Sequence, residues 1–140
     1  MIVLALDPGS RRVGVALSDP GGSFAFPQPP IEVTAGDGHL AAIARLVAER
    51  QVERIVVGLP IGLDGREGPA AKSARRFAAA VERATGRPVE LFDERFTTTQ
   101  AHREMIAAGR KRKHRRGAVD SAAAALLLES WLAARQEPHP

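Results

Sequence analysis

Three carboxylates in this chain of 140 residues stand beside apolar sequence, where an ionised group is costly unless a positive charge pairs with it. Asp7 directly follows the apolar residues 2–6, and Glu94 closely follows residues 89–92, which have the pattern of a strand. Asp120 heads the apolar stripe of a predicted helix. Oxygen donors without a histidine or cysteine partner suit Mg²⁺ or Mn²⁺, which bind phosphates. Two such ions about 4 Å apart can activate a water and stabilise a leaving oxygen, so the residues predict a phosphodiester hydrolase.

Asp120 has two interpretations at the level of sequence. It is spaced 4-3-4 with Ala124, Leu127 and Trp131, so it belongs to the stripe by which the last helix packs. An aspartate in a first turn commonly caps its helix or interacts favourably with the helix dipole. The other interpretation is that Asp120 converges with Asp7 and Glu94. The spacing leaves both open.

A dense basic block precedes the last helix. Six of the twenty lysines and arginines fall within seven consecutive positions, in a chain whose net charge is only +4. They are Arg110, Lys111, Arg112, Lys113, Arg115 and Arg116. Such a block attracts polyphosphate and suggests a nucleic-acid partner. A solvated loop or a charged helix end is the alternative.

Five segments have the pattern of β-strands, at residues 2–6, 13–17, 24–31, 55–57 and 89–92. The first two are close enough in sequence to form a hairpin. The third contains Pro27, Pro29 and Pro30, which cannot donate hydrogen bonds to a neighbouring strand, so it is expected at an edge of the sheet.

Four segments have helical periodicity. In the first, after residues 36–38, the predicted apolar stripe is Leu40, Ile43, Ala44, Val47 and Ala48. In the second, which begins at Pro69 and ends at Gly86, the predicted stripe is Ala70, Ala74, Phe77, Val81 and Ala84. The third has the capping pair Thr97 and Gln100 and carries Ala101, Met105 and Ile106. The fourth is expected from about residue 119 to residue 134.

The resulting order, βββαβαβαα, predicts an α/β fold with a mixed five-stranded sheet and helices on both faces. The crossover connections make strands one, four and five parallel, with strand two antiparallel to strand one. Asp7 and Glu94 then lie at the same edge of the sheet, where open α/β sheets bind their ligands. If strand four separates them, Glu94 starts about 10 Å from Asp7 and must reach inward.

Composition limits the class of protein. With no cysteine, the chain has neither disulfides nor a thiolate metal site, and a reducing cytoplasm is the expected location. No segment approaches the ~20 apolar residues of a membrane span, so no membrane partner is expected. We expect one domain at residues 1–135, followed by a loose tail at residues 136–140.

Four motifs together resemble the YqgF/RuvX family of ribonuclease H-like nucleases, in order and over nearly the whole chain. They are Leu4-Ala5-Leu6-Asp7-Pro8-Gly9-Ser10-Arg11-Arg12-Val13-Gly14-Val15-Ala16-Leu17-Ser18-Asp19, Gly58-Leu59-Pro60 with Asp64-Gly65, Asp93-Glu94-Arg95-Phe96-Thr97-Thr98, and Val119-Asp120-Ser121-Ala122-Ala123. The resemblance implies a ribonuclease H-like fold and divalent-metal-dependent cleavage of nucleic acid. Family members are described as candidate Holliday junction resolvases, by similarity to RuvC, or as nucleases that mature the 5′ end of 16S ribosomal RNA.

Carried over by position, Asp7, Glu94 and Asp120 match the family's acids and are the expected catalytic residues and ligands of Mg²⁺ or Mn²⁺. The sequence therefore predicts a metal-dependent nuclease. A nucleic-acid-binding protein on the same fold that does not cut is the alternative. RNA and DNA both remain possible substrates. The protein is expected as a monomer or homodimer, and resolving a junction with two-fold symmetry would require the dimer.

Other residues near the acids have open roles. Arg11 and Arg12, after Asp7, could contact substrate phosphates or be solvated at a hairpin tip. Arg95 could clamp a phosphate or neutralise the acids around it. Strand alternation sends Asp93 and Glu94 to opposite faces, so Asp93 could instead hold a neighbouring backbone group or an arginine.

Overall fold

The computed structural model describes residues 1–96 and 116–136, with the backbone alone at positions 96, 116–120 and 136. Its elements are β1 (Val3–Pro8), β2 (Arg12–Ser18), β3 (Ala25–Glu32), α1 (Gly38–Glu49), β4 (Arg54–Leu59), α2 (Pro69–Thr85), β5 (Val89–Asp93), the 3₁₀ turn η1 (Glu94–Phe96) and α4 (Arg116–Gln136). All five predicted strands are present. The predicted helix with Ala101, Met105 and Ile106, and its capping pair Thr97 and Gln100, lie outside the described residues.

The strands form one five-stranded sheet in the order β3-β2-β1-β4-β5. β1 is antiparallel to β2 and parallel to β4, and β4 is parallel to β5, which confirms the predicted mixed sheet. β3 pairs only with β2 and forms an edge, as its prolines require. β4 lies between β1 and β5, so the two strands that carry Asp7 and lead to Glu94 are not neighbours.

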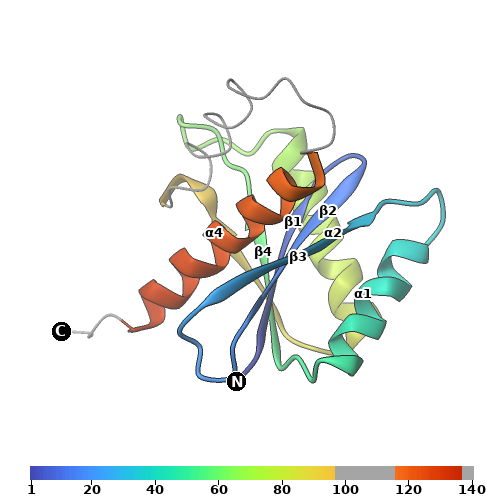
Figure 1. Ribbon diagram of the computed structural model, residues 1–140. Coiled ribbons are helices and arrows are strands. Elements are labelled where there is room, and N and C mark those ends of the chain that lie inside the picture. The colour runs from blue at the N-terminus through green and yellow to red at the C-terminus, as the bar shows by residue number, and fades with distance from the viewer. Residues whose placement is uncertain (97–115, 137–140) are drawn as a thin grey trace.

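Helices cover both faces of the sheet, as predicted (Figure 1). On one face, Leu4 and Leu6 of β1 pack in a cluster with α1 and α2. On the other, Val3 and Ala5 pack in a cluster with α4. Because successive side chains of a strand alternate between faces, Asp7 continues the series of Val3 and Ala5 on the α4 face.

Two predicted helix stripes need correction. α2 begins at Pro69 and ends at Gly86, which has a φ of 70°, as expected. Its buried residues, however, are Ala71, Ala74, Ala78 and Val81, whereas Ala70 and Ala84 are exposed. In α1, Ala48 is also exposed. Alanines recur on several sides of these helices, so periodicity alone did not determine which side would contact the sheet.

The last helix agrees with its predicted stripe. Ala124, Leu127 and Trp131 are all at most 2% exposed. α4 begins at Arg116, about one turn before the predicted start, and runs to Gln136, the first residue of the predicted tail. The rest of that tail, residues 137–140, lies outside the described residues.

Candidate active site

Asp7 lies near the end of β1, at the carboxyl edge of the parallel strands. In the β1–β2 ladder it pairs with Gly14, and its side chain is partly buried. The β1–β4 pairing ends at Leu6 and Val57, so the next residues along the two strands are Asp7 and Gly58. Asp7 therefore stands beside Gly58 on the face covered by α4.

Glu94 reaches from the end of β5 across β4 toward β1. Its side chain is 1% exposed. A Cβ atom added to Gly58 would lie 2.6 Å from Glu94 Oε1 and 3.3 Å from Glu94 Cδ. The carboxylate thus occupies the space that a side chain at position 58 would fill. The inward reach expected of Glu94 is what the structure shows.

Asp93 turns away from Glu94 and pairs with Arg95. Arg95 donates its backbone N–H to Asp93 Oδ1 at 2.9 Å, and its guanidinium donates to Oδ2 at 2.8 Å and 3.1 Å. The side-chain hydrogen bonds from Arg95 are the main reason that the pKa of Asp93 lies below its ordinary value. Asp93 therefore holds both a backbone group and an arginine, the two alternatives that the sequence suggested for it.

The start of α4 is attached to the sheet through Ser121. This side chain is 2% exposed, and its hydroxyl donates a hydrogen bond to the backbone carbonyl of Gln28 in β3. Further along the helix, Leu127 Cδ2 lies 3.3 Å from the position that a Gly58 Cβ would occupy. α4 begins at the edge of the sheet where β1 ends (Figure 1).

Asp120 belongs to the first turns of α4 and precedes Ser121. It comes seven residues, about two turns, before Leu127 and so shares its helical face. Its side chain lies outside the described part of the structure. The backbone position agrees with convergence on Asp7 and Glu94, and that convergence remains a prediction.

Sequence reasoning missed the roles of Gly58 and Ser121. A glycine inside an apolar strand often marks close approach of another group, so Gly58 carried a usable signal. Ser121 carried none, because its partner Gln28 is remote in sequence and the contact depends on how α4 crosses β3.

The predicted nucleic-acid-binding residues are only partly visible. Arg11 is exposed in the β1–β2 turn, and Arg12 Nε lies 4.0 Å from Glu32 Oε1. Arg95 forms an ion pair with Asp93. The rest of the predicted basic set, Arg110, Lys111, Arg112, Lys113 and Arg115, lies outside the described residues, as does the side chain of Arg116.

The donor chemistry at this edge fits a hard divalent cation. Asp7 and Glu94 offer carboxylate oxygens on the same face of the sheet, and these are the ligands that Mg²⁺ and Mn²⁺ prefer. Within residues 1–96 and 116–136, no group of three histidine, aspartate or glutamate side chains is placed to hold a metal. Of Asp120, the third predicted ligand, the structure describes only the backbone, so this absence does not extend to its side chain.

No helix among the described residues is long and apolar enough to span a membrane.

Comparisons with known protein sequences match almost the whole chain. The RuvX family model, described as Holliday junction resolvase, matches residues 1–134. Candidate pre-16S rRNA nucleases from Maridesulfovibrio salexigens, Chloroflexus aurantiacus and Mycobacterium leprae are 40%, 42% and 45% identical to it. The alignments cover 95%, 96% and 92% of this chain and 98%, 88% and 71% of those proteins.

Solved structures show the same fold at low sequence identity. RuvC from T. thermophilus, in complex with a Holliday junction substrate, gives a TM-score of 0.60 at 19% identity, covering 97% of this chain and 96% of that one. Fowlpox virus resolvase, in complex with junction DNA, gives 0.55 at 10% identity, covering 98% and 100%. At such identities the likeness shows the fold alone, which is ribonuclease H-like as expected.

Proposed function

Because the chain belongs to the RuvX family, we propose that it is a divalent-metal-dependent nuclease that hydrolyses phosphodiester bonds in nucleic acid. The observation that carries the proposal is the position of Glu94. Its buried carboxylate lies over Gly58, next to the strand that carries Asp7. The names of relatives at 40–45% identity support the same activity.

In this proposal, Asp7, Glu94 and Asp120 hold Mg²⁺ or Mn²⁺. A divalent cation bound to them would lower the pKa of water and stabilise charge on the phosphate. The protein supplies carboxylate oxygens from three separate elements, β1, η1 and α4. The Glu94 carboxylate lies against the backbone of Gly58, and Leu127 packs at the same place. These contacts orient the carboxylate before a metal ion binds.

For the substrate, we favour a ribosomal RNA precursor, because the relatives named above are described as pre-16S rRNA nucleases. The second candidate is a four-way DNA junction, which the description of the family model supports. The exposed Arg11 and the basic block from Arg110 to Arg116 would bind the phosphate backbone. The absence of cysteine favours action in the cytoplasm.

Asp7→Asn should lower the cleavage rate at least about 100-fold. Mutating a residue that only hydrogen-bonds to a metal ligand commonly lowers activity about 10–100-fold, and the loss of a ligand itself should cost at least as much. Nucleic-acid binding should be largely retained, since the amide keeps the shape of the side chain. Cleavage of a precursor-rRNA fragment, a single-stranded DNA and a four-way junction in Mg²⁺ or Mn²⁺ measures this. Light scattering on the same samples gives the oligomeric state.

Asp37→Asn is the matched control, because Asp37 is exposed at the start of α1 and makes no side-chain capping hydrogen bond. It should cleave like the wild type. If Asp7→Asn also cleaves like the wild type, Asp7 has no part in the reaction. If the wild-type protein binds these substrates and cleaves none of them with either metal, the protein is the non-catalytic binder that the sequence left open.

A further inference from the structure

The connection between β4 and α2 presents an apolar side chain to solvent beside the candidate site. Leu63, in this connection, is 89% exposed. The next most exposed large apolar side chains of the described residues are Phe24 at 65% and Phe26 at 50%. Single exposed apolar residues are common, so exposure alone is uninformative. The way in which Leu63 is held is more informative.

Residues 62–66 form a closed turn around Leu63. The Gly62 N–H donates to the Arg66 carbonyl at 3.0 Å, and the Gly65 N–H donates to the Gly62 carbonyl at 2.8 Å. Asp64 Oδ1 accepts the Arg66 N–H at 3.0 Å. Gly65 has a φ of 85°, a conformation that residues with a side chain rarely adopt. The backbone around Leu63 is therefore fixed by its own hydrogen bonds.

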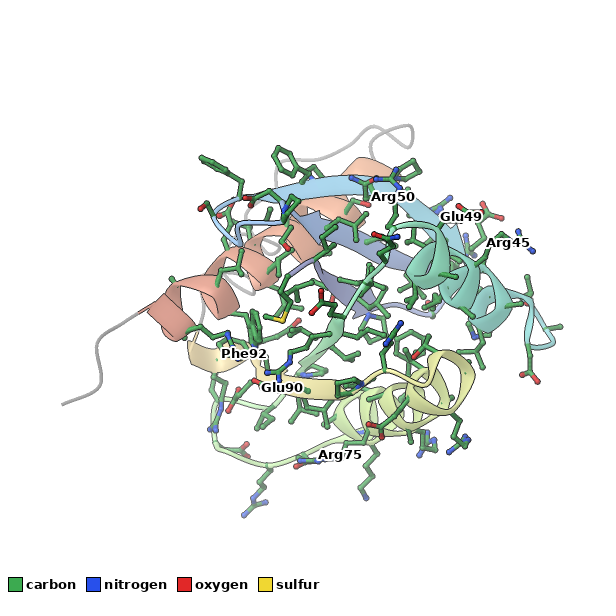
Figure 2. The ribbon with its side chains drawn as sticks, turned by 90° about the horizontal axis from the view of Figure 1, so that it is seen from below. Arg45, Glu49, Arg50, Arg75, Glu90 and Phe92 are labelled. Carbon is green, nitrogen blue, oxygen red and sulfur yellow. The ribbon has the colours of Figure 1, made fainter. Side chains whose placement is uncertain are left out.

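The two ends of this turn are attached to α2. Ile61 packs against the apolar cluster of Leu59, Ala71 and Ala74. On the other side, Arg75 of α2, labelled in Figure 2, donates to both oxygens of Glu67 at 2.7 Å and 2.6 Å. These hydrogen bonds from Arg75 lower the pKa of Glu67, so the pair stays charged at neutral pH.

The turn also meets the element that carries Glu94. Arg95 Nη1 lies 3.4 Å from the position that a Cβ of Gly65 would occupy. Two exposed cations lie close to the turn in the chain: the Arg66 side chain is 89% exposed, and Lys72 is exposed on the first turns of α2, where its charge helps to lower the pKa of Glu67. Asp64 Oδ2 lies 3.8 Å from Arg66 Nε. An exposed ion pair of this kind contributes little to stability, so a substrate phosphate could take the place of Asp64 beside Arg66.

We propose that residues 62–66 form a nucleic-acid-reading turn, in which Leu63 packs on the face of an unstacked base while Arg66 binds a neighbouring phosphate. The inference rests on the proposed function and adds the substrate contact of its site. Apolar wedges of this kind separate stacked bases in other nucleic-acid complexes. The cations beside Leu63 favour a polyanion over a protein surface. The attachments to α2 hold the wedge in place before binding, which reduces the entropy lost.

A fluorescence experiment tests the turn independently of cleavage. The probe is a precursor-rRNA oligonucleotide with 2-aminopurine at successive positions, mixed with the full-length protein in EDTA. Unstacking of the probe base raises its fluorescence. The wild type should raise it at one or a few adjacent positions. Leu63→Ser should abolish that rise and weaken binding about tenfold, the loss expected for a partly buried leucine.

Two further variants separate the contributions. Leu63→Phe keeps an apolar wedge and should keep the fluorescence rise. Phe24→Ser removes an exposed apolar side chain from the β2–β3 turn at the opposite edge of the sheet and should change nothing. Arg66→Gln should weaken binding and reduce the slope of log affinity against log salt concentration by about 1, the value for one phosphate contact. The probe base should still unstack, because Leu63 is unchanged.

The outcomes distinguish this inference from the proposed function. If Leu63→Ser matches the wild type in fluorescence and affinity while the wild type cleaves in Mg²⁺, the turn does not read the substrate and the nuclease proposal stands. A change in oligomeric mass with an unchanged fluorescence profile overturns the inference and assigns Leu63 to a protein interface. If the wild type neither binds nor cleaves nucleic acid, both fail. Unstacking that depends on Leu63, without any cleavage, supports the turn and overturns the nuclease.

Discussion

Adjacent carboxylates at the end of β5 have opposite environments. Glu94 is 1% exposed and lies over Gly58, whereas Asp93 pairs with Arg95 on the other side of the backbone. Strand alternation separates them, and the backbone hydrogen bond from Arg95 to Asp93 holds the chain as it leaves β5. We infer that Asp93 and Arg95 position Glu94 and that Gly58 leaves the space for it.

Gly58→Ala should lower the cleavage rate about 10- to 100-fold, the range found when a metal ligand loses its support. The added Cβ would come within 2.6 Å of Glu94 Oε1, and the end of that side chain can move more easily than the backbone. Stability should also fall, by about 1–3 kcal/mol, because Glu94 is buried and Leu127 Cδ2 lies 3.3 Å from the added Cβ. Cleavage kinetics and urea unfolding measure the two effects.

Gly36→Ala is the control for this substitution. Nothing lies within 4 Å of the position of its Cβ, and its φ is outside the left-handed region. Both its activity and its stability should match the wild type. Equal activity in Gly58→Ala and Gly36→Ala would show that the position of Glu94 over Gly58 is irrelevant to cleavage.

Asp93→Asn should lower the melting temperature by a few degrees at pH 7 and have no effect in strong acid. The hydrogen bonds from Arg95 hold the pKa of Asp93 below its ordinary value of 3.8. Its stabilising contribution is thus complete above the unfolded pKa and is lost as pH falls through the folded pKa. The melting curves of wild type and variant should converge only in acid, once the pH has fallen below this lowered pKa.

Thermal unfolding followed by circular dichroism between pH 2 and pH 7 measures this dependence, with Asp37→Asn as the exposed control. A difference between wild type and Asp93→Asn that is the same at every pH would mean that the ion pair with Arg95 contributes nothing, and that the substitution acts through packing.

At the scale of elements, α4 depends on contacts at both of its ends. Ser121 attaches its beginning to β3, and near its end Trp131 Nε1 donates to Glu90 Oε2 of β5 at 2.9 Å. The Arg135 guanidinium lies 4.7 Å from the centre of the Trp131 ring. Glu90 is labelled in Figure 2 beside Phe92, which packs in the apolar cluster under α4. Trp131 is the only tryptophan in the chain, so its fluorescence reports the docking of this helix.

Ser121→Ala should destabilise the fold by about 1–2 kcal/mol, because it leaves the partly buried carbonyl of Gln28 without this hydrogen bond. Cleavage should fall as well, since Asp120 is the neighbouring residue. Trp131 fluorescence during urea unfolding measures the first effect. Ser73→Ala, at an exposed position of α2, is the control. Unchanged stability in Ser121→Ala would mean that apolar packing alone holds the start of α4.

At the scale of the molecule, the fold gathers its candidate chemistry at one edge. β1, β4 and β5 are parallel, so the turn after β1, the turn that contains Leu63, and η1 all follow the carboxyl ends of strands. α4 begins at the same edge (Figure 1). The opposite edge holds the N-terminus, whose ammonium donates to the Pro20 carbonyl, and the β2–β3 turn. A substrate strand would therefore approach from the carboxyl edge.

Replacing Lys111, Arg112 and Lys113 together by glutamine should weaken nucleic-acid binding. It should also reduce the slope of log affinity against log salt concentration, by the amount expected for the loss of up to about three phosphate contacts. The reason is that each phosphate contact releases counterions. Binding titrations between about 50 and 200 mM salt measure the slope. Arg45→Gln, at an exposed position of α1, is the comparison with a single cation outside the block and outside the turn of residues 62–66. If the slope is unchanged in the triple variant, these three residues do not contact the nucleic acid, and the basic block is a solvated segment.

The sequence by itself determined the order of strands and helices along the chain, the parallel and antiparallel directions of the strands, the edge position of β3 and the side of α4 that packs on the sheet. These features follow from local patterns, such as alternation, prolines without donors and a 4-3-4 stripe ending at Trp131. The sequence also placed Asp7 and Glu94 at one edge, since the carboxyl ends of parallel strands meet there. That β4 lies between β1 and β5 was decided by the tertiary structure.

Only the tertiary structure decided how Glu94 reaches toward Asp7, which partner Asp93 takes and where α4 is attached. The reach of Glu94 and the attachment of α4 depend on contacts between segments remote in sequence, namely Glu94 with Gly58 and Ser121 with Gln28. Asp93 pairs with its near neighbour Arg95, where the chain leaves β5 and enters η1. The exposed sides of Ala70 and Ala84 were decided in the same way, because an alanine-rich helix offers several similar faces to the sheet. Local pattern specifies which side chains are apolar or charged, but the space that each one occupies depends on the side chains packed around it.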